Sequence, residues 1–254
     1  MQSELVPEPT RPHPRTLIIM PAWNEEEVIG ETVAEVRTAL PWIDLLVVDD
    51  GSTDSTAETA RRAGATVLSL PYNLGVGGAL RAGFKYAWRG GYDQAIQVDA
   101  DGQHNPVDVP RVLEGLQRAD ISIGARFAGE GDYQARGPRR WAMTLLATTI
   151  SSAAKTKLND VTSGFRAANR RAILQYTEHF PAEYLGDTID SLVTAIRAGL
   201  VVTQVPVAMR PRQGGVPSKN PWKSTIYLGR AAFALLIAAT RRRTPAPRLK
   251  EVEA

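Results

Sequence analysis

Short apolar runs alternate along the chain with segments in which apolar residues recur every three or four positions. The runs predict strands at residues 16–20, 45–48, 66–70, 94–98 and 120–124. The segments between them predict helices near residues 29–40, 55–63, 79–89 and 109–116. Strands that alternate with helices of this length form βαβ units, so we expect an α/β domain whose sheet is mainly parallel and covered by helices on both faces.

The pattern changes after residue 124. Residues 125–138 are rich in glycine and charged residues, which is typical of a loop. The pattern beyond predicts helices near residues 139–157, 170–176 and 188–198 and a last strand at 201–209. Before the first helix, Asn24 followed by Glu27 matches a capping box, in which the Asn24 side chain would cap the helix.

The two ends of the chain differ from this core. Residues 1–15 are rich in proline and lack the apolar stretch of a secretory signal, so we expect a disordered lead before a domain over residues 16–220. Residues 221–243 predict a helix with one apolar face that ends in three arginines, followed by a flexible tail at 244–254. Such a helix can lie in a membrane interface beside anionic headgroups, or pack on the domain or a dimer partner.

Composition excludes several classes of site. The chain has 254 residues and is 43% hydrophobic, which is enough for a large core, and its formal charge of +3 does not indicate nucleic acid. It has no cysteine, which excludes disulfides, thiolate catalysis and cysteine-type zinc sites. With only three histidines, we do not expect a multi-histidine metal centre. No stretch reaches the ~20 apolar residues of a membrane-spanning helix.

Acidic residues follow directly on two predicted strands. Asp49 and Asp50 follow one strand, and Asp99 and Asp101 follow another. Loops that leave parallel strands collect at the carboxyl edge of the sheet, where ligands of such sheets bind. In an extended chain, residues i and i+2 point to the same side, so Asp99 and Asp101 would share one small volume and attract a hard cation such as Mg²⁺ or Mn²⁺. Turn formation alone explains one acid in a loop, but two loops here carry two or more.

Four motifs together resemble a known family. They are Pro21-Ala22-Trp23-Asn24-Glu25, Val48-Asp49-Asp50-Gly51-Ser52-Thr53-Asp54, Asp99-Ala100-Asp101-Gly102-Gln103 and Ser163-Gly164-Phe165-Arg166. In this order and spacing they resemble family-2 glycosyltransferases of GT-A fold, and within them the branch of dolichol- or polyprenol-phosphate sugar transferases. The resemblance extends from residue 17 to about residue 223.

The resemblance implies a set of site residues. A nucleotide-sugar pocket would be formed by Pro21, Ala22, Asn24, Glu25, Asp49, Asp50, Gly75, Asp99, Ala100 and Asp101. The metal ligands would be Asp99, Asp101 and Gln103. Donor and acceptor phosphates would contact Arg126, Arg139, Arg140, Arg166, Arg212, Ser218 and Lys219. The residues expected to take part in catalysis are Asp101, Arg126 and Asp187.

The role of Asp187 depends on the acceptor. An acceptor hydroxyl needs a base, and Asp187 stands where related enzymes place one, whereas an acceptor phosphate is already an anion and needs none. Asp187 also suits the cap of a helix that starts at Thr188, and both roles stay open.

The resemblance implies metal-dependent, inverting transfer of a hexose from a GDP- or UDP-sugar to a polyprenyl phosphate. We then expect a peripheral protein on the cytoplasmic face of the plasma membrane, with no nucleic-acid partner and with a homodimer or a membrane-protein partner left open. One alternative is a soluble family-2 transferase that uses a sugar or small-molecule hydroxyl, with Asp187 as base. An alternative of another class is a non-catalytic protein that binds nucleotide sugars or acts as a scaffold.

Overall fold

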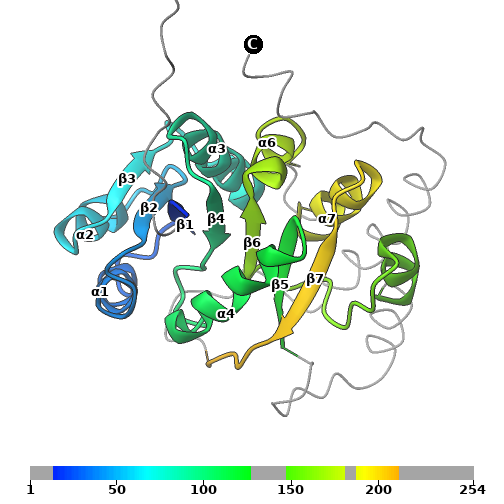
Figure 1. Ribbon diagram of the computed structural model, residues 1–254. Helices are drawn as coiled ribbons and strands as arrows, with labels where there is room; N and C mark the ends of the chain where they lie inside the picture. Colours follow the sequence, from blue (N-terminus) through cyan, green and yellow to red (C-terminus); the bar gives the residue numbers. More distant parts are fainter. Residues whose placement is uncertain (1–13, 127–146, 181–186, 212–254) are drawn as a thin grey trace, which may run out of the picture.

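The fold is an α/β sandwich built on one twisted sheet (Figure 1). The computed structural model describes residues 14–126, 147–180 and 187–211. Within them the strands are β1 (Thr16–Ala22), β2 (Asp44–Asp49), β3 (Thr66–Ser69), β4 (Gln94–Gln97), β5 (Ile121–Ala125), β6 (Arg166–Asn169) and β7 (Val202–Pro206). The labelled helices are α1 (Ile29–Ala39), α2 (Thr56–Arg62), α3 (Gly75–Arg89), α4 (Val109–Glu114), α6 (Arg170–His179) and α7 (Asp187–Arg197), with short 3₁₀ turns η1 (Pro106–Asp108) and η2 (Gly115–Gln117) on either side of α4; residues 147–154 are also helical.

The described strands form a seven-stranded sheet in the order β3-β2-β1-β4-β6-β5-β7. All neighbouring pairs are parallel except those of β6, which runs antiparallel to both β4 and β5. The order reverses between β1 and β4, because the chain first builds outward through β2 and β3 and then returns to the other side of β1. Such a reversal opens a crevice at the carboxyl ends of the two strands.

Alternation along the strands divides the core into two layers. Leu17 and Ile19 of β1 face α3, α6 and α7, whereas Ile18 and Met20 face α1, α2 and α4. All four side chains are essentially inaccessible to solvent, as strands buried on both faces require. The predicted α/β class with helices on both faces is therefore confirmed.

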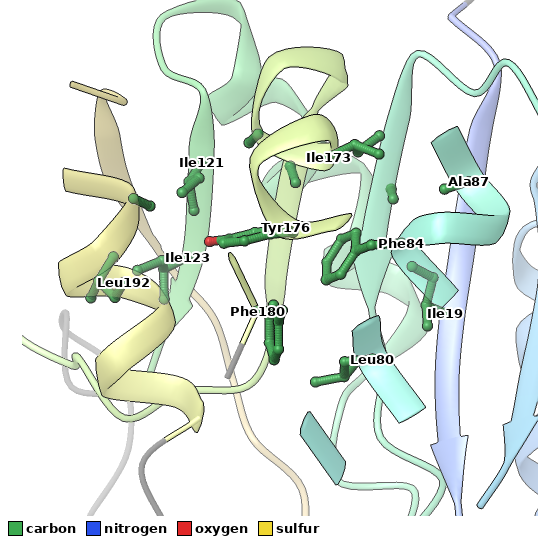
Figure 2. Packing of buried hydrophobic residues seen from close by; sticks show 14 of the residues in the cluster. Ile19, Leu80, Phe84, Ala87, Ile121, Ile123, Ile173, Tyr176, Phe180 and Leu192 are labelled. Carbon is green, nitrogen blue, oxygen red and sulfur yellow. The ribbon is translucent and has the colours of Figure 1, made fainter. Parts of the chain in front are cut away.

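Aromatic rings fill the layer beneath α3 and α6. The ring centroid of Phe84 lies 4.8 Å from that of Tyr176 and 5.5 Å from that of Phe180 (Figure 2). Burial raises the pKa of Tyr176 to about 12, although the charge of Arg166 acts in the opposite direction. The Tyr176 hydroxyl has no hydrogen-bond partner among the described residues.

Three local expectations need correction. The sequence pattern did not reveal strand β6, and helix α3 begins at Gly75, four residues before the expected start. The capping box at Asn24 is wrong: α1 begins at Ile29 after Val28, without a side-chain cap. Asn24 instead adopts a left-handed backbone conformation with φ of 54°, and its side chain accepts a hydrogen bond from the Thr53 amide at 2.9 Å.

The predicted terminal segments lie outside the described residues. These are most of the lead at 1–15, the interfacial helix at 221–243 and the tail at 244–254. Among the helices in the described part of the chain, none combines the length and the apolar character needed to cross a bilayer.

Candidate active site

A cleft of about 310 Å³ opens where the strand order reverses. Its walls come from the loops that follow β1, β2, β3 and β4, together with Thr162, Gly164 and Thr188. The volume is at the lower end of the range for small-molecule sites. Four carboxylates line the cleft, those of Glu25, Asp50, Asp99 and Asp101, so its electrostatic potential favours a cation or a ligand that carries one.

Hydrogen bonds that involve side chains join two of the loops that line the cleft. The Asn24 amide donates to Ser52 Oγ at 3.0 Å, and the Glu25 amide donates to Thr56 Oγ1 at 2.8 Å. Asn24 itself accepts from Thr53, as described above. These contacts join the loop after β1 to the loop after β2 and hold Pro21, Ala22 and Glu25 against the cleft.

Asp50 positions a third loop. Its Oδ1 accepts the Leu74 amide at 2.8 Å, directly before helix α3 begins at Gly75. Burial raises the pKa of Asp50 even though this backbone contact and the Gly75 amide act to lower it; the neighbouring Asp49 raises it further. Gly51 allows the close approach: its φ is 68°, and a Cβ there would lie 2.6 Å from the Tyr72 carbonyl carbon.

Asp99 and Asp101 both reach the cleft, but from a turn and not from a strand. β4 ends at Gln97, and Ala100 and Asp101 lie in the turn that follows. Asp101 is 8% exposed and its Oδ1 accepts the Gln103 amide at 3.1 Å, whereas the side chain of Asp99 is 36% exposed. The prediction that both carboxylates share one volume is consistent with this geometry. The reason differs from the predicted one, because the chain between the two residues turns and is not extended.

The two carboxylates suit a hard divalent cation. Mg²⁺ is commonly bound by one or two carboxylates, with water and substrate phosphates completing its coordination. No group of three or more Asp, Glu, His or Cys side chains within the described residues is arranged to hold a metal by protein ligands alone. Asp99 and Asp101 therefore fit an ion that is completed by the ligand. Gln103, the third predicted ligand, does not line the described part of the cleft, and its backbone carbonyl accepts the Arg210 amide at 3.0 Å.

Arg126 binds protein groups next to the cleft. Its guanidinium contacts Asp160 through Nε at 2.6 Å and Nη2 at 3.0 Å, and Nη2 also donates to Thr162 Oγ1 at 2.7 Å. Burial alone would raise the pKa of Asp160, but the hydrogen bond and charge of Arg126, helped by Thr162, lower it overall. Arg126 thus holds the turn that carries Thr162; the predicted phosphate contact stays a prediction.

Arg166 also binds protein groups beside the cleft. The residue is 7% exposed, and its guanidinium donates to the carbonyls of Ser163, Thr188 and Val161 at 2.8, 2.6 and 2.8 Å. These contacts join the 161–163 turn to the start of α7. The predicted phosphate contact of Arg166 stays a prediction.

The remaining predicted residues divide into three groups. Pro21, Ala22, Gly75 and Ala100 line the cleft as expected, while Asp49 lies behind it, 5% exposed, accepting the Ser52 amide at 3.1 Å. Arg139, Arg140, Arg212, Ser218 and Lys219 lie outside the described residues. Asp187 is the first described residue of α7 and its side chain is not described, so its predicted roles as base or helix cap both stay open; its neighbour Thr188 lines the cleft.

Several cleft residues were not assigned to the site from sequence. They are Trp23, Asn73, Val76, Ala79, Gln97, Thr162, Gly164 and Thr188. Two carried a usable signal. Trp23 lies inside a motif and is 49% exposed, and Gln97 is a polar residue that ends strand β4 directly before the acidic motif.

Comparisons with known proteins identify the family of the chain. A family model described as glycosyl transferase family 2 matches residues 17–177. Polyprenol monophosphomannose synthase of Mycolicibacterium smegmatis is 34% identical over 220 residues, which cover 83% of this chain and 83% of that protein. Undecaprenyl-phosphate mannosyltransferase of Micrococcus luteus is 32% identical over 211 residues, which cover 79% of this chain and 86% of that protein.

A solved structure supports the fold. The crystal structure of glucosyl-3-phosphoglycerate synthase from Mycobacterium tuberculosis with Mn²⁺, UDP-glucose and phosphoglyceric acid matches with a TM-score of 0.66 over 95% of this chain and 92% of that one, at 22% identity. At this identity the likeness concerns the GT-A fold alone. The family match spans β1 to α6 and includes the loops that carry Asp50, Asp99 and Asp101. The chain therefore belongs to glycosyl transferase family 2 and is a glycosyltransferase of GT-A fold.

Proposed function

We propose that this glycosyltransferase moves a hexose from a nucleotide-diphosphate sugar to a polyprenyl phosphate, with inversion and with Mg²⁺ or Mn²⁺. The observation that carries the proposal is the pair Asp99 and Asp101, which reach one open cleft at the reversal of strand order. Two relatives named for polyprenol or undecaprenyl phosphate, each matched over most of both chains, support the acceptor.

Different residues of the cleft would have different roles in this reaction. The loops after β1, β2 and β3 form the side that would receive the nucleotide, and Asp99 and Asp101 would hold the cation near its diphosphate. A bound Mg²⁺ or Mn²⁺ supplies charge neutralisation for a leaving diphosphate. The acceptor phosphate is an anion at neutral pH, so its oxygen can attack the anomeric carbon without a protein base. Direct displacement breaks the sugar–phosphate bond on the opposite side and inverts the anomeric centre.

A hydroxyl acceptor is the second candidate. The matched glucosyl-3-phosphoglycerate synthase was solved with phosphoglyceric acid, which is not a lipid. Helix α7 begins at Asp187, and Thr188 faces the cleft, so a base at Asp187 would be close to the acceptor side. Under this alternative, Asp187 would accept the proton of the attacking hydroxyl.

A transfer assay with two acceptors separates these functions. The full chain is incubated with GDP- and UDP-hexoses and Mn²⁺, once with detergent-solubilised polyprenyl phosphate and once with soluble alcohols such as phosphoglyceric acid. We expect glycolipid only, and expect Asp187→Asn to retain most of it. Product from the alcohol alone, abolished by Asp187→Asn, would replace the proposal with the second candidate.

The same proposal places the protein at a membrane surface, because its acceptor is a lipid. We propose peripheral attachment on the cytoplasmic face, with the basic, one-sided pattern of residues 221–243 as the contact. That segment lies outside the described residues, so the support is the sequence pattern alone.

A further inference from the structure

His104 is buried directly beneath the Asp99 turn. It is 3% exposed, and its ring stacks on Phe165 with centroids 4.7 Å apart and an angle of 13° between planes. On its backbone it forms an isolated β-bridge with Met209, which follows β7. The side chain does not line the cleft.

Both ring nitrogens of His104 face the same aspartate. Nδ1 accepts a hydrogen bond from the Asp99 amide at 2.9 Å, and Nε2 lies 3.6 Å from Asp99 Oδ2. A nitrogen that accepts an N–H cannot itself carry a proton, so the ring proton of the neutral imidazole is on Nε2. At 3.6 Å, Nε2 lies slightly beyond hydrogen-bond distance of the carboxylate oxygen.

Gln97 contacts the other oxygen of the same carboxylate. Its Nε2 donates to Asp99 Oδ1 at 2.9 Å, and the residue is 8% exposed. Gly164 lies against this pair, since a Cβ there would be 2.8 Å from Gln97 Nε2 and 3.5 Å from Asp99 Oδ2. Asp99 is thus hydrogen-bonded at its amide and at Oδ1, with His104 Nε2 3.6 Å from Oδ2, whereas Asp101 accepts the Gln103 amide within its own turn.

We propose that His104 and Gln97 are positioning residues that fix the backbone and carboxylate of Asp99 for cation binding. The inference rests on the proposed metal-dependent function. Side chains that orient a metal ligand from behind usually change metal affinity or activity by about 10–100-fold when they are removed. The part of Asp99 left exposed faces the cleft, where a diphosphate-bound cation would meet it.

Substitutions can distinguish the contribution of each polar contact to Asp99. His104→Asn places an amide oxygen near the position of Nδ1 and keeps an acceptor for the Asp99 amide. His104→Phe keeps the stacking on Phe165 and removes both polar contacts. Gln97→Met preserves the length of the side chain and removes the donor to Asp99 Oδ1. His179→Asn is the matched control, because the His179 side chain is 48% exposed on α6.

Mn²⁺ binding is the readout, measured by EPR titration on the full chain, alone and with UDP or GDP. We expect His104→Phe and Gln97→Met to weaken Mn²⁺ binding by about 10–100-fold, His104→Asn to weaken it less than His104→Phe, and His179→Asn to leave it unchanged. Nucleotide binding in EDTA should stay within about twofold for the two His104 variants and for His179→Asn, because neither histidine lines the cleft.

Three results overturn the inference. One is a folded His104→Phe or Gln97→Met variant that binds Mn²⁺ with the same affinity as the wild type. If His104→Phe does not fold, Gln97→Met alone provides this test. Another is a His104→Asn variant no better than His104→Phe. A third is a long-range ¹H–¹⁵N spectrum of the ligand-free protein that places the His104 proton on Nδ1.

The same titration separates this inference from the proposed function. If the wild type binds Mn²⁺ and Asp101→Asn weakens binding while the His104 and Gln97 variants do not, only the positioning role fails. If the wild type binds no Mn²⁺ with either nucleotide, the metal-dependent function fails and the positioning role fails with it.

Discussion

The contact between Arg126 and Asp160 gives the sharpest prediction about stability. The Asp160 side chain is fully buried and that of Arg126 is 30% exposed, and the two are joined by contacts of 2.6 and 3.0 Å. In Arg126→Met the aspartate would remain buried without its cation. Removal of one partner from a buried pair costs about 3–5 kcal/mol, and partial exposure of Arg126 favours the lower end, about 3 kcal/mol.

This loss should depend on pH in a defined direction. In the wild type the pKa of Asp160 is lowered, so the pair stabilises the fold above the ordinary aspartate pKa of about 4 and loses this effect as pH falls through the lower, folded-state pKa. In Arg126→Met, burial without the guanidinium raises the Asp160 pKa, so the carboxyl becomes protonated on folding as pH falls. The difference between variant and wild type should be largest at neutral pH and should shrink toward pH 4 or so.

Thermal unfolding at several pH values tests this reasoning. At neutral pH, a loss of about 3 kcal/mol corresponds to a decrease in Tm of about 6–12 °C for a chain of this size. Asp160→Asn is the control, because it removes the buried charge and leaves Arg126 able to reach water; its loss should be smaller and independent of pH. A loss below about 1 kcal/mol for Arg126→Met, or the same loss at neutral and acid pH, would refute the account of this pair.

Three further predictions follow from other features. Tyr176→Phe should raise the free energy of unfolding by about 1 kcal/mol, because the buried hydroxyl has no partner among the described residues; a clear loss in denaturant unfolding would contradict this. Gly164→Ala should reduce transfer activity by more than tenfold while the chain stays folded by circular dichroism, since the new Cβ, 2.8 Å from Gln97 Nε2, would displace the amide that donates to Asp99; wild-type turnover would argue against a close fit there. Removal of residues 223–254 should weaken sedimentation with anionic vesicles more than nucleotide binding, and unchanged sedimentation would reject an interfacial helix.

Much of the fold was predictable because it depends on local periodicity. Runs buried on both faces predicted β1, β2 and β4, and acids at their carboxyl ends predicted the edge that holds the cleft. Strand β6 was missed because its four residues, Arg166–Asn169, begin and end with polar side chains, and its first residue is the last residue of the Ser163–Arg166 motif. Its pairing is with β4 and β5, far away in sequence, and no local pattern reports that.

The role of a site residue was harder to predict from the sequence where its side chain could bind either of two partners. Asn24 is a good helix cap by type, but its backbone conformation directs it to Thr53, 29 residues away. Arginine type alone does not distinguish a phosphate ligand from a group that binds carbonyls, which is what Arg166 does. The contacts of His104 with Asp99 depend on the turn that follows β4, and the sequence pattern did not define how this turn folds back.

The central claim is that a phosphate oxygen of a lipid attacks the anomeric carbon directly. NMR of the purified product tests it in one measurement, because ¹H–³¹P coupling at the anomeric proton reports the new bond and the anomeric proton itself reports the configuration. We predict a sugar linked through its anomeric carbon to polyprenyl phosphate, with the configuration opposite to that of the donor. A product linked to a hydroxyl without phosphorus coupling, or one that retains the donor configuration, would contradict the claim.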